Sequence, residues 1–288
     1  MPSSPRSDAV LVDSGDLSNS PPVSATVAVE TAPPVLFQRR RWMLTNMNSS
    51  TQHITHQRTM PGMLRPIERF SGAVLTGTIL MLAVLAFGLF LSRSREITRV
   101  DLSADGALSR IHAIPVTDIA RAIYTLFSPA GAIALTVVVT VVIWAVSRNW
   151  RSALTFAVVV AVSWLSSDIV KMLVNRPRPS AAALAHPYLP TPPDPSFPSG
   201  HVVFAASIAI ALVFLSRNTA RVALVGALGV VGTVLVAVAV VYLGVHYPTD
   251  VIASIIWALG ACTLVLALWN RFVIPRVFPS AGIVNSPK

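Results

Sequence analysis

Cysteine is almost missing from this sequence, since Cys262 is the only one among its 288 residues. A single thiol excludes an internal disulfide framework, and it excludes the zinc sites that are built from paired cysteines. Cys262 lies inside an apolar run. We therefore interpret it as a small apolar packing residue.

Charged side chains are also scarce. They make up 12% of the residues, whereas soluble domains carry about 25%, and the mean hydropathy is +0.67. This composition predicts a membrane protein. In a soluble protein the net charge of +10 would suggest a nucleic-acid partner. Here the basic residues lie mainly between apolar segments, where they set the topology and contact anionic membrane lipids, so no nucleic-acid partner is expected.

Long apolar runs are what the sequence does contain. A helix that crosses a bilayer needs roughly 20 apolar residues, and six segments reach or approach that length: residues 70–92, 129–147, 152–173, 201–216, 222–245 and 250–270. They predict an all-α bundle of six transmembrane helices over residues 67–276. Residues 1–66, rich in Ser, Pro, Thr and Arg, are expected to be a disordered basic cytoplasmic tail, and residues 277–288 a short C-terminal tail.

The distribution of arginine predicts the orientation in the membrane. Arginines precede the first apolar segment and occupy the loops after the second, fourth and sixth, at Arg148, Arg151, Arg217, Arg221, Arg271 and Arg276. Because short cytoplasmic loops are enriched in Lys and Arg, both termini are expected in the cytoplasm, with the protein in the plasma membrane. The outer loop 93–128 also carries arginines, accompanied by acidic residues. Its part 116–127 is predicted to be amphipathic and to lie on the membrane surface.

A basic stretch and a helix start together predict a phosphate site. Lys171, Arg176 and Arg178 lie at the end of the third apolar segment, and Pro198-Ser199-Gly200-His201 opens the fourth. A helix N-terminus presents unpaired amide groups and a positive dipole end, both of which bind phosphate. His201 would supply an acid–base group inside that site. The predicted orientation places these residues on the outer face.

A histidine and a carboxylate follow at the same outer edge. His246 and Asp250 are four residues apart, and Pro248 predicts that the sixth helix begins between them. Ionisable residues at a membrane boundary are costly and usually functional. A nearby carboxylate can fix the tautomer of a histidine and stabilise its charged form.

These residues resemble the three motifs of the type 2 phosphatidic acid phosphatase (PAP2) superfamily. The matching positions are Lys171 followed after six residues by Arg178-Pro179, then Pro198-Ser199-Gly200-His201, then His246 followed after three residues by Asp250. The resemblance covers roughly residues 70–270. It implies a PAP2/chloroperoxidase-like helical bundle and a lipid phosphatase that needs no metal and no other cofactor.

The resemblance also implies a role for each matching residue. His246 would attack phosphorus and form a phospho-histidine, with Asp250 orienting it. His201 would protonate the leaving oxygen and then activate water. Lys171, Arg178 and the amides around Ser199 and Gly200 would hold the phosphoryl oxygens, with Arg176 as a further cation of the first motif.

One departure from the family pattern leaves two functions open. The third motif normally carries Ser-Arg ahead of the nucleophile, where this sequence has Ala239-Val240. The chain is either a phosphatase that takes the missing cation from elsewhere, or a weakly active or non-catalytic relative that binds lipid phosphates. A transporter is disfavoured, because the charges gather at one face. Polyprenyl diphosphate, phosphatidic acid, phosphatidylglycerophosphate and a prenyl-linked sugar phosphate all fit as substrates, and the oligomeric state stays open.

Overall fold

The computed structural model describes residues 70–216 and 218–277, and the regular structure in these ranges is entirely helical. The all-α prediction is therefore confirmed. The predicted disordered tail at 1–66 lies outside the described residues, as do residues 278–288 of the predicted C-terminal tail.

Five helices in the described part of the chain are long and apolar enough to cross a membrane. They are α2 (Phe70–Leu91), α5 (Pro129–Ser147), α6 (Trp150–Val174), α8 (Thr219–Tyr242) and α9 (Pro248–Leu268), the last continuing through a π-turn (Trp269–Val273) into α10 (Ile274–Val277). α7 (Gly200–Leu215) is equally apolar, but it has only 16 residues. The structure thus confirms five of the six predicted spans by length and composition, and the sixth stays a prediction.

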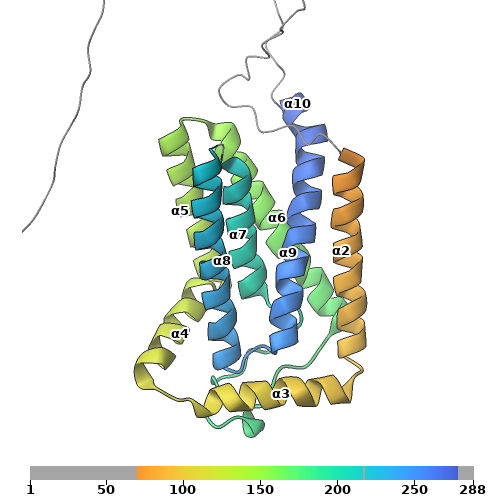
Figure 1. Ribbon diagram of the computed structural model, residues 1–288, viewed down its shortest axis with the longest axis vertical. Coiled ribbons are helices and arrows are strands. Elements are labelled where there is room, and N and C mark those ends of the chain that lie inside the picture. Colours follow the sequence, from red (N-terminus) through yellow and green to blue (C-terminus); the bar gives the residue numbers. More distant parts are fainter. Residues whose placement is uncertain (1–69, 217, 278–288) are drawn as a thin grey trace, which may run out of the picture. The chain divides into compact units, whose positions relative to one another are not determined.

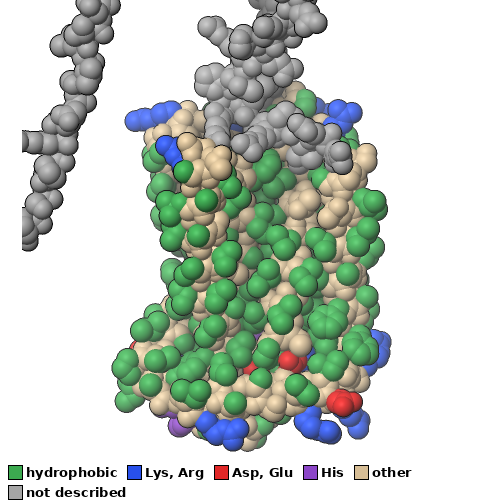
Figure 2. Space-filling model, viewed as in Figure 1, with side chains coloured by type: hydrophobic (Ala, Val, Ile, Leu, Met, Phe, Trp, Pro, Cys, Tyr) green, Lys and Arg blue, Asp and Glu red, His purple; other side chains and the backbone are tan. Residues whose placement is uncertain are grey.

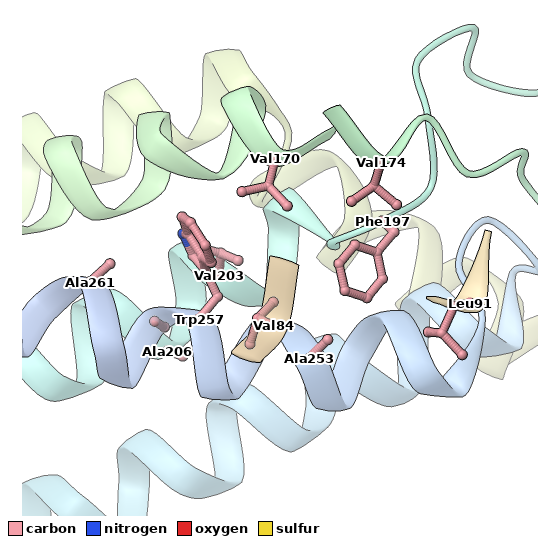
Figure 3. Packing of buried hydrophobic residues seen from close by; sticks show 11 residues of the cluster. Val84, Leu91, Val170, Val174, Phe197, Val203, Ala206, Ala253, Trp257 and Ala261 are labelled. Carbon is pink, nitrogen blue, oxygen red and sulfur yellow. The ribbon is translucent and has the colours of Figure 1, made fainter. Parts of the chain in front are cut away.

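The long helices lie side by side around a core of small and branched side chains (Figure 1). α2 packs so closely on α9 that a Cβ atom on Gly77 would lie only 2.8 Å from the main-chain oxygen of Gly260. Small residues let helix backbones approach in this way. Figure 3 shows the neighbouring cluster, in which Val84 of α2, Val203 of α7 and Trp257 of α9 meet.

α7 lies inside the bundle and positions the predicted site. It packs against α6, α8 and α9, and seven of its residues are buried. On the face shown in Figure 2, hydrophobic side chains cover the middle of the bundle and Lys and Arg gather at its two ends. α7 therefore carries its first turn, with His201, to one of these polar ends.

A helix that the sequence patterns did not predict closes this end of the bundle. α3 (Arg95–Arg110) runs across the ends of the long helices, and α4 (Ile114–Leu126) leads from it to α5 (Figure 1). Ser94 caps α3 by accepting a hydrogen bond from the Ile97 amide. The residues that α3 buries are polar, namely Asp101, Asp105 and Ser109. A search for apolar periodicity misses such a helix, because the residues that it buries most deeply are polar, although Ile97 and Leu108 also pack against the core.

Candidate active site

The predicted site residues come together at the end of the bundle that α3 crosses. Lys171 lies in the last turn of α6, and Arg176 and Arg178 follow in the extended segment after Asn175. Ser199 is the N-cap of α7, and His246 lies in the short connection between α8 and α9. The rings of His201 and His246 lie in a T-shaped arrangement, with 6.3 Å between their centroids.

His246 is fully buried, and its hydrogen bonds define its tautomer. Its Nδ1 lies 2.7 Å from the main-chain oxygen of Ser196. Since a carbonyl oxygen can only accept, Nδ1 carries the proton and Nε2 keeps its lone pair. Arg178 Nη1 lies 3.2 Å from Nε2. Burial, reinforced by the charges of Arg178 and Lys171, holds the pKa of His246 well below its usual range, so the ring is neutral.

Asp250 does not make the hydrogen bond to His246 that its predicted orienting role requires. Its Oδ2 is 3.8 Å from His246 Nδ1 and accepts instead from the Tyr247 amide at 3.0 Å. Its Oδ1 accepts from Arg176 Nη1 at 2.6 Å. The Ser196 carbonyl orients the imidazole in its place. Sequence reasoning missed Ser196, because no pattern of side chains identifies which main-chain carbonyl a distant histidine will meet.

Arg176 is not placed as a phosphate-binding residue. Its side chain is 1% exposed, and its guanidinium forms ion pairs with Asp101 at 2.8 Å and with Asp250 at 2.6 Å. It also donates to Thr249 at 2.8 Å and lies over the Tyr247 ring, 4.2 Å from the centroid. Two carboxylates already neutralise this cation. The predicted phosphate contact of Arg176 is therefore corrected to a buried structural one that ties α3 to α9.

Lys171 and Arg178 are paired through Asp194, in the loop between α6 and α7. Arg178 Nη2 lies 2.9 Å from Asp194 Oδ1, and Lys171 Nζ contacts Oδ2. Arg178 also donates from Nε to the Asp194 carbonyl at 2.8 Å and from Nη1 to the Val245 carbonyl at 2.6 Å. Burial by itself would raise the pKa of Asp194, but the hydrogen bonds and charges of Lys171 and Arg178 outweigh it and lower the pKa to about 2. Asp194 is a second site residue that was absent from the predicted set.

The start of α7 brings a free nitrogen and a buried hydroxyl to the site. His201 stacks on Tyr124 of α4, with 4.3 Å between the ring centroids, and its buried Nε2 has no hydrogen-bond partner within the described ranges. Ser199 differs from its prediction, because its amide already donates to Ser254 Oγ at 2.8 Å. Its buried hydroxyl has no partner among the described residues. The hydroxyl of Ser199, and not its amide, is therefore available to a phosphoryl oxygen.

Val240 stands where the family motif carries an arginine, and its surroundings are apolar as well. Val240 is fully buried in a cluster with Val202, Val236 and Val245. No guanidinium reaches the site from this position. Lys171 and Arg178 are the two predicted phosphate-binding cations that the structure brings to the histidines, within the part of the chain that it describes.

Comparison with known proteins shows which family this part of the chain resembles. Residues 151–274, which contain all three motifs, match the model of the PAP2 superfamily. The chain is 31% identical over 126 residues to an undecaprenyl-diphosphatase of Sulfolobus acidocaldarius, covering 43% of this chain and 57% of that protein. It is 32% identical over 91 residues to the undecaprenyl-diphosphatase BcrC of Bacillus subtilis, covering 32% and 44%. The chain thus spans about half the length of these curated relatives.

A solved structure shows the same fold. The crystal structure of a transmembrane PAP2 type phosphatidylglycerolphosphate phosphatase from Bacillus subtilis superposes with a TM-score of 0.54 at 23% identity, over 69% of this chain and 94% of that one. The family model that residues 151–274 match is the one that the three motifs predicted, and the likeness to the solved structure shows the fold. The apolar helices and this fold indicate an integral membrane protein, and its residues 151–274 match the PAP2 superfamily model.

Proposed function

We propose that this protein is a lipid phosphatase that removes a terminal phosphate through a covalent intermediate on His246. The observation that carries the proposal is the lone pair of His246 Nε2, which accepts a hydrogen bond from Arg178 Nη1 at 3.2 Å until a phosphoryl group takes that cation, while the His201 ring centroid lies 6.3 Å from that of His246. A neutral imidazole beside a cation can attack a phosphorus atom whose oxygens that cation neutralises.

In the first half-reaction, His246 Nε2 forms a bond to phosphorus and the bond from phosphorus to the lipid oxygen breaks. His201 donates a proton to that leaving oxygen, in the protonated form that the negative charge of a bound phosphate favours over the neutral ring of the empty site. The imidazole of His246 gains positive charge in this step while Nδ1–H stays bonded to the Ser196 carbonyl. Asp250, with Oδ2 3.8 Å from Nδ1, stabilises that charge through space.

In the second half-reaction, neutral His201 takes a proton from water and the water oxygen attacks phosphorus. The bond between phosphorus and His246 breaks, which releases inorganic phosphate and restores the free imidazole. Lys171 and Arg178 neutralise the phosphoryl oxygens in both steps, and positioning with charge neutralisation is the main source of rate in phosphoryl transfer. No metal ion is required by this scheme.

Polyprenyl diphosphate is the substrate class that we favour. Its support is the similarity to two proteins named undecaprenyl-diphosphatase. Phosphatidic acid and phosphatidylglycerophosphate remain the comparison substrates, since the fold neighbour is named for the latter. We further propose that α7 is a sixth span and that the site opens on the outer face of the plasma membrane, because Arg148, Arg151 and Arg271 belong to the opposite end.

A second candidate function is lipid-phosphate binding with little or no turnover. The observation that favours it is the apolar burial of Val240 together with the engagement of Arg176 by two carboxylates. Both leave the site without the cation that the family pattern supplies. One preorganised donor of this kind can be worth ~10²–10³ in rate.

Phosphate release by the purified protein in detergent, with a metal chelator present, separates the two candidates. Polyprenyl diphosphate, phosphatidic acid and phosphatidylglycerophosphate are compared, beside His246→Ala and the control His112→Ala in the exposed turn after α3. We expect chelator-resistant release that only His246→Ala abolishes. Release that stops with the chelator would contradict the metal-free scheme. Binding of these lipids by the native protein without any release would establish the second candidate.

A further inference from the structure

A carboxylate of the protein occupies the cations that a substrate phosphate needs. Asp194 contacts both Lys171 Nζ and Arg178 Nη2, so its two oxygens span the pair. For attack by His246, the phosphorus must come within about 3–3.5 Å of Nε2. Arg178 Nη1 already lies 3.2 Å from that nitrogen. A phosphoryl group in the reactive position therefore competes with the Asp194 carboxylate for the same guanidinium and ammonium groups.

The Asp194 side chain can leave without disturbing the loop that carries it. It is 47% exposed, whereas the side chains of Arg178 and Lys171 are 6% and 11% exposed. Arg178 Nε holds the main-chain oxygen of Asp194 at 2.8 Å, and the amide of Ser196 donates to the Arg176 carbonyl at 2.8 Å. The backbone is thus fixed on both sides of a carboxylate that needs only a side-chain rotation to move into water.

The charges decide which ligands can displace Asp194. Lys171 and Arg178 bring two positive charges, and Asp194 returns one negative charge. A phosphodiester carries one negative charge, so exchanging it for the carboxylate gains no charge neutralisation. A terminal phosphate that carries two negative charges neutralises the pair completely. This difference matters at a membrane surface, because phosphodiester headgroups surround the site at high local concentration.

We propose that Asp194 is a specificity-determining residue, which occupies Lys171 and Arg178 until a dianionic terminal phosphate displaces it and thereby excludes the phosphodiester headgroups of the bilayer. This role rests on the proposed phosphatase function. Asp194 accordingly acts as an internal competitor. It weakens the binding of every anion. Only a dianion still binds, because only a dianion neutralises the two cations better than the Asp194 carboxylate does. The pKa of about 2 keeps its carboxylate charged at any physiological pH.

The test removes the charge of Asp194 and leaves its shape. Asp194→Asn is compared with the native protein, with Asp194→Glu, which restores the charge, and with Asp118→Asn, the same change at an exposed position of α4. Hydrolysis of a short prenyl diphosphate is measured in mixed micelles with increasing phosphatidylglycerol at constant detergent. Size-exclusion profiles confirm that each variant is folded.

We expect Asp194→Asn to lower KM about tenfold and to become inhibited about tenfold by phosphatidylglycerol. The native protein, Asp194→Glu and Asp118→Asn should change by less than about twofold. A KM that rises in Asp194→Asn, or an unchanged response to phosphatidylglycerol, would overturn the proposal.

A binding measurement separates this inference from the proposed function. Competition between a non-hydrolysable prenyl phosphonate and phosphatidylglycerol is followed without turnover. If the native protein hydrolyses nothing, the proposed function fails. The inference still stands or falls on whether Asp194→Asn, and not Asp118→Asn, gains affinity for the phosphodiester.

Discussion

His246 Nδ1 lies 2.7 Å from the main-chain oxygen of Ser196 and 3.8 Å from the carboxylate of Asp250. The backbone, and not the acidic side chain, therefore sets the tautomer of the proposed nucleophile. In serine proteases the aspartate sets it, and its replacement by asparagine costs about 10⁴ in kcat because the wrong tautomer forms. A backbone carbonyl cannot be removed by substitution, so this site should tolerate the loss of its carboxylate better.

Asp250→Asn should accordingly lower kcat by only about 10²-fold, the cost of one lost stabilising charge. His246→Ala should abolish turnover. Steady-state phosphate release from both variants, normalised to folded protein, provides the measurement. A loss near 10⁴-fold in Asp250→Asn would show that the carboxylate, and not Ser196, controls the tautomer.

Replacing His201, the proposed acid–base group, should trap the phosphorylated form of His246. In His201→Ala, a substrate whose leaving oxygen needs no proton should still phosphorylate His246. The second half-reaction should then stall, because no group activates water. We expect a burst of about one leaving group per protein and an acid-labile, alkali-stable phosphate label. Steady turnover without a burst would contradict the assignment, and His112→Ala serves as the unaffected control.

Replacing the two arginines of one motif should have different effects, one mainly on stability and the other mainly on activity. Arg176→Gln breaks a buried network with Asp101 and Asp250, and removing one partner of a buried ion pair costs about 3–5 kcal/mol of stability. Arg178→Gln should destabilise the fold less, because its partner Asp194 is 47% exposed, but it should lower kcat/KM by about 10²–10³. Thermal unfolding in detergent and phosphate release distinguish these outcomes. Equal loss of stability in both variants would contradict the division.

Asp105 should make the stability of the protein depend on pH. Its buried carboxyl has no hydrogen-bond partner within the described residues. Burial, with repulsion from Asp101 and Asp250 that Arg176 only partly offsets, raises its pKa from 3.8 to about 8. The folded protein thus keeps a proton that the unfolded chain loses near pH 4. Its contribution to stability is fully present below about pH 4 and is lost as pH rises to about 8, above which it is constant.

Asp105→Asn mimics the protonated acid and should remove this dependence. We expect the unfolding temperature of the native protein to fall between pH 5 and pH 8 more steeply than that of the variant. The difference corresponds to a few kcal/mol, on the order of the linked proton's free energy. The same pH slope in both proteins would show that Asp105 ionises normally in the folded state.

The proposed orientation can be tested with introduced thiols, because Cys262 is fully buried. Ala185 is exposed at the end of the bundle that carries the site, and Ser147 is exposed at the end of α5, on the opposite side. In intact cells, a membrane-impermeant maleimide should label Ala185→Cys and not Ser147→Cys. After lysis, the maleimide should label both introduced cysteines. Labelling of Ser147→Cys alone in intact cells would show that the protein has the opposite orientation.

The apolar helices and the family could be predicted from the sequence, but α3 could not. A long apolar run has one way to satisfy its backbone in a bilayer, which is to form a helix. α3 follows a different logic, because the face that it buries carries Asp101, Asp105 and Ser109. Its burial is stabilised by an ion pair with Arg176, which lies 75 residues away in the chain. No local pattern contains that information.

By itself, the sequence determined where the apolar helices lie and which motif residues are carried to one end of the bundle, since both follow from the order and length of apolar segments. Tertiary structure decided the partners. Arg176 and Arg178 are two residues apart, yet one is buried between two carboxylates and the other faces the proposed nucleophile. Such contacts depend on how α3, α6 and α9 pack, because hydrogen bonds and ion pairs require atoms from distant segments to meet within about 3 Å.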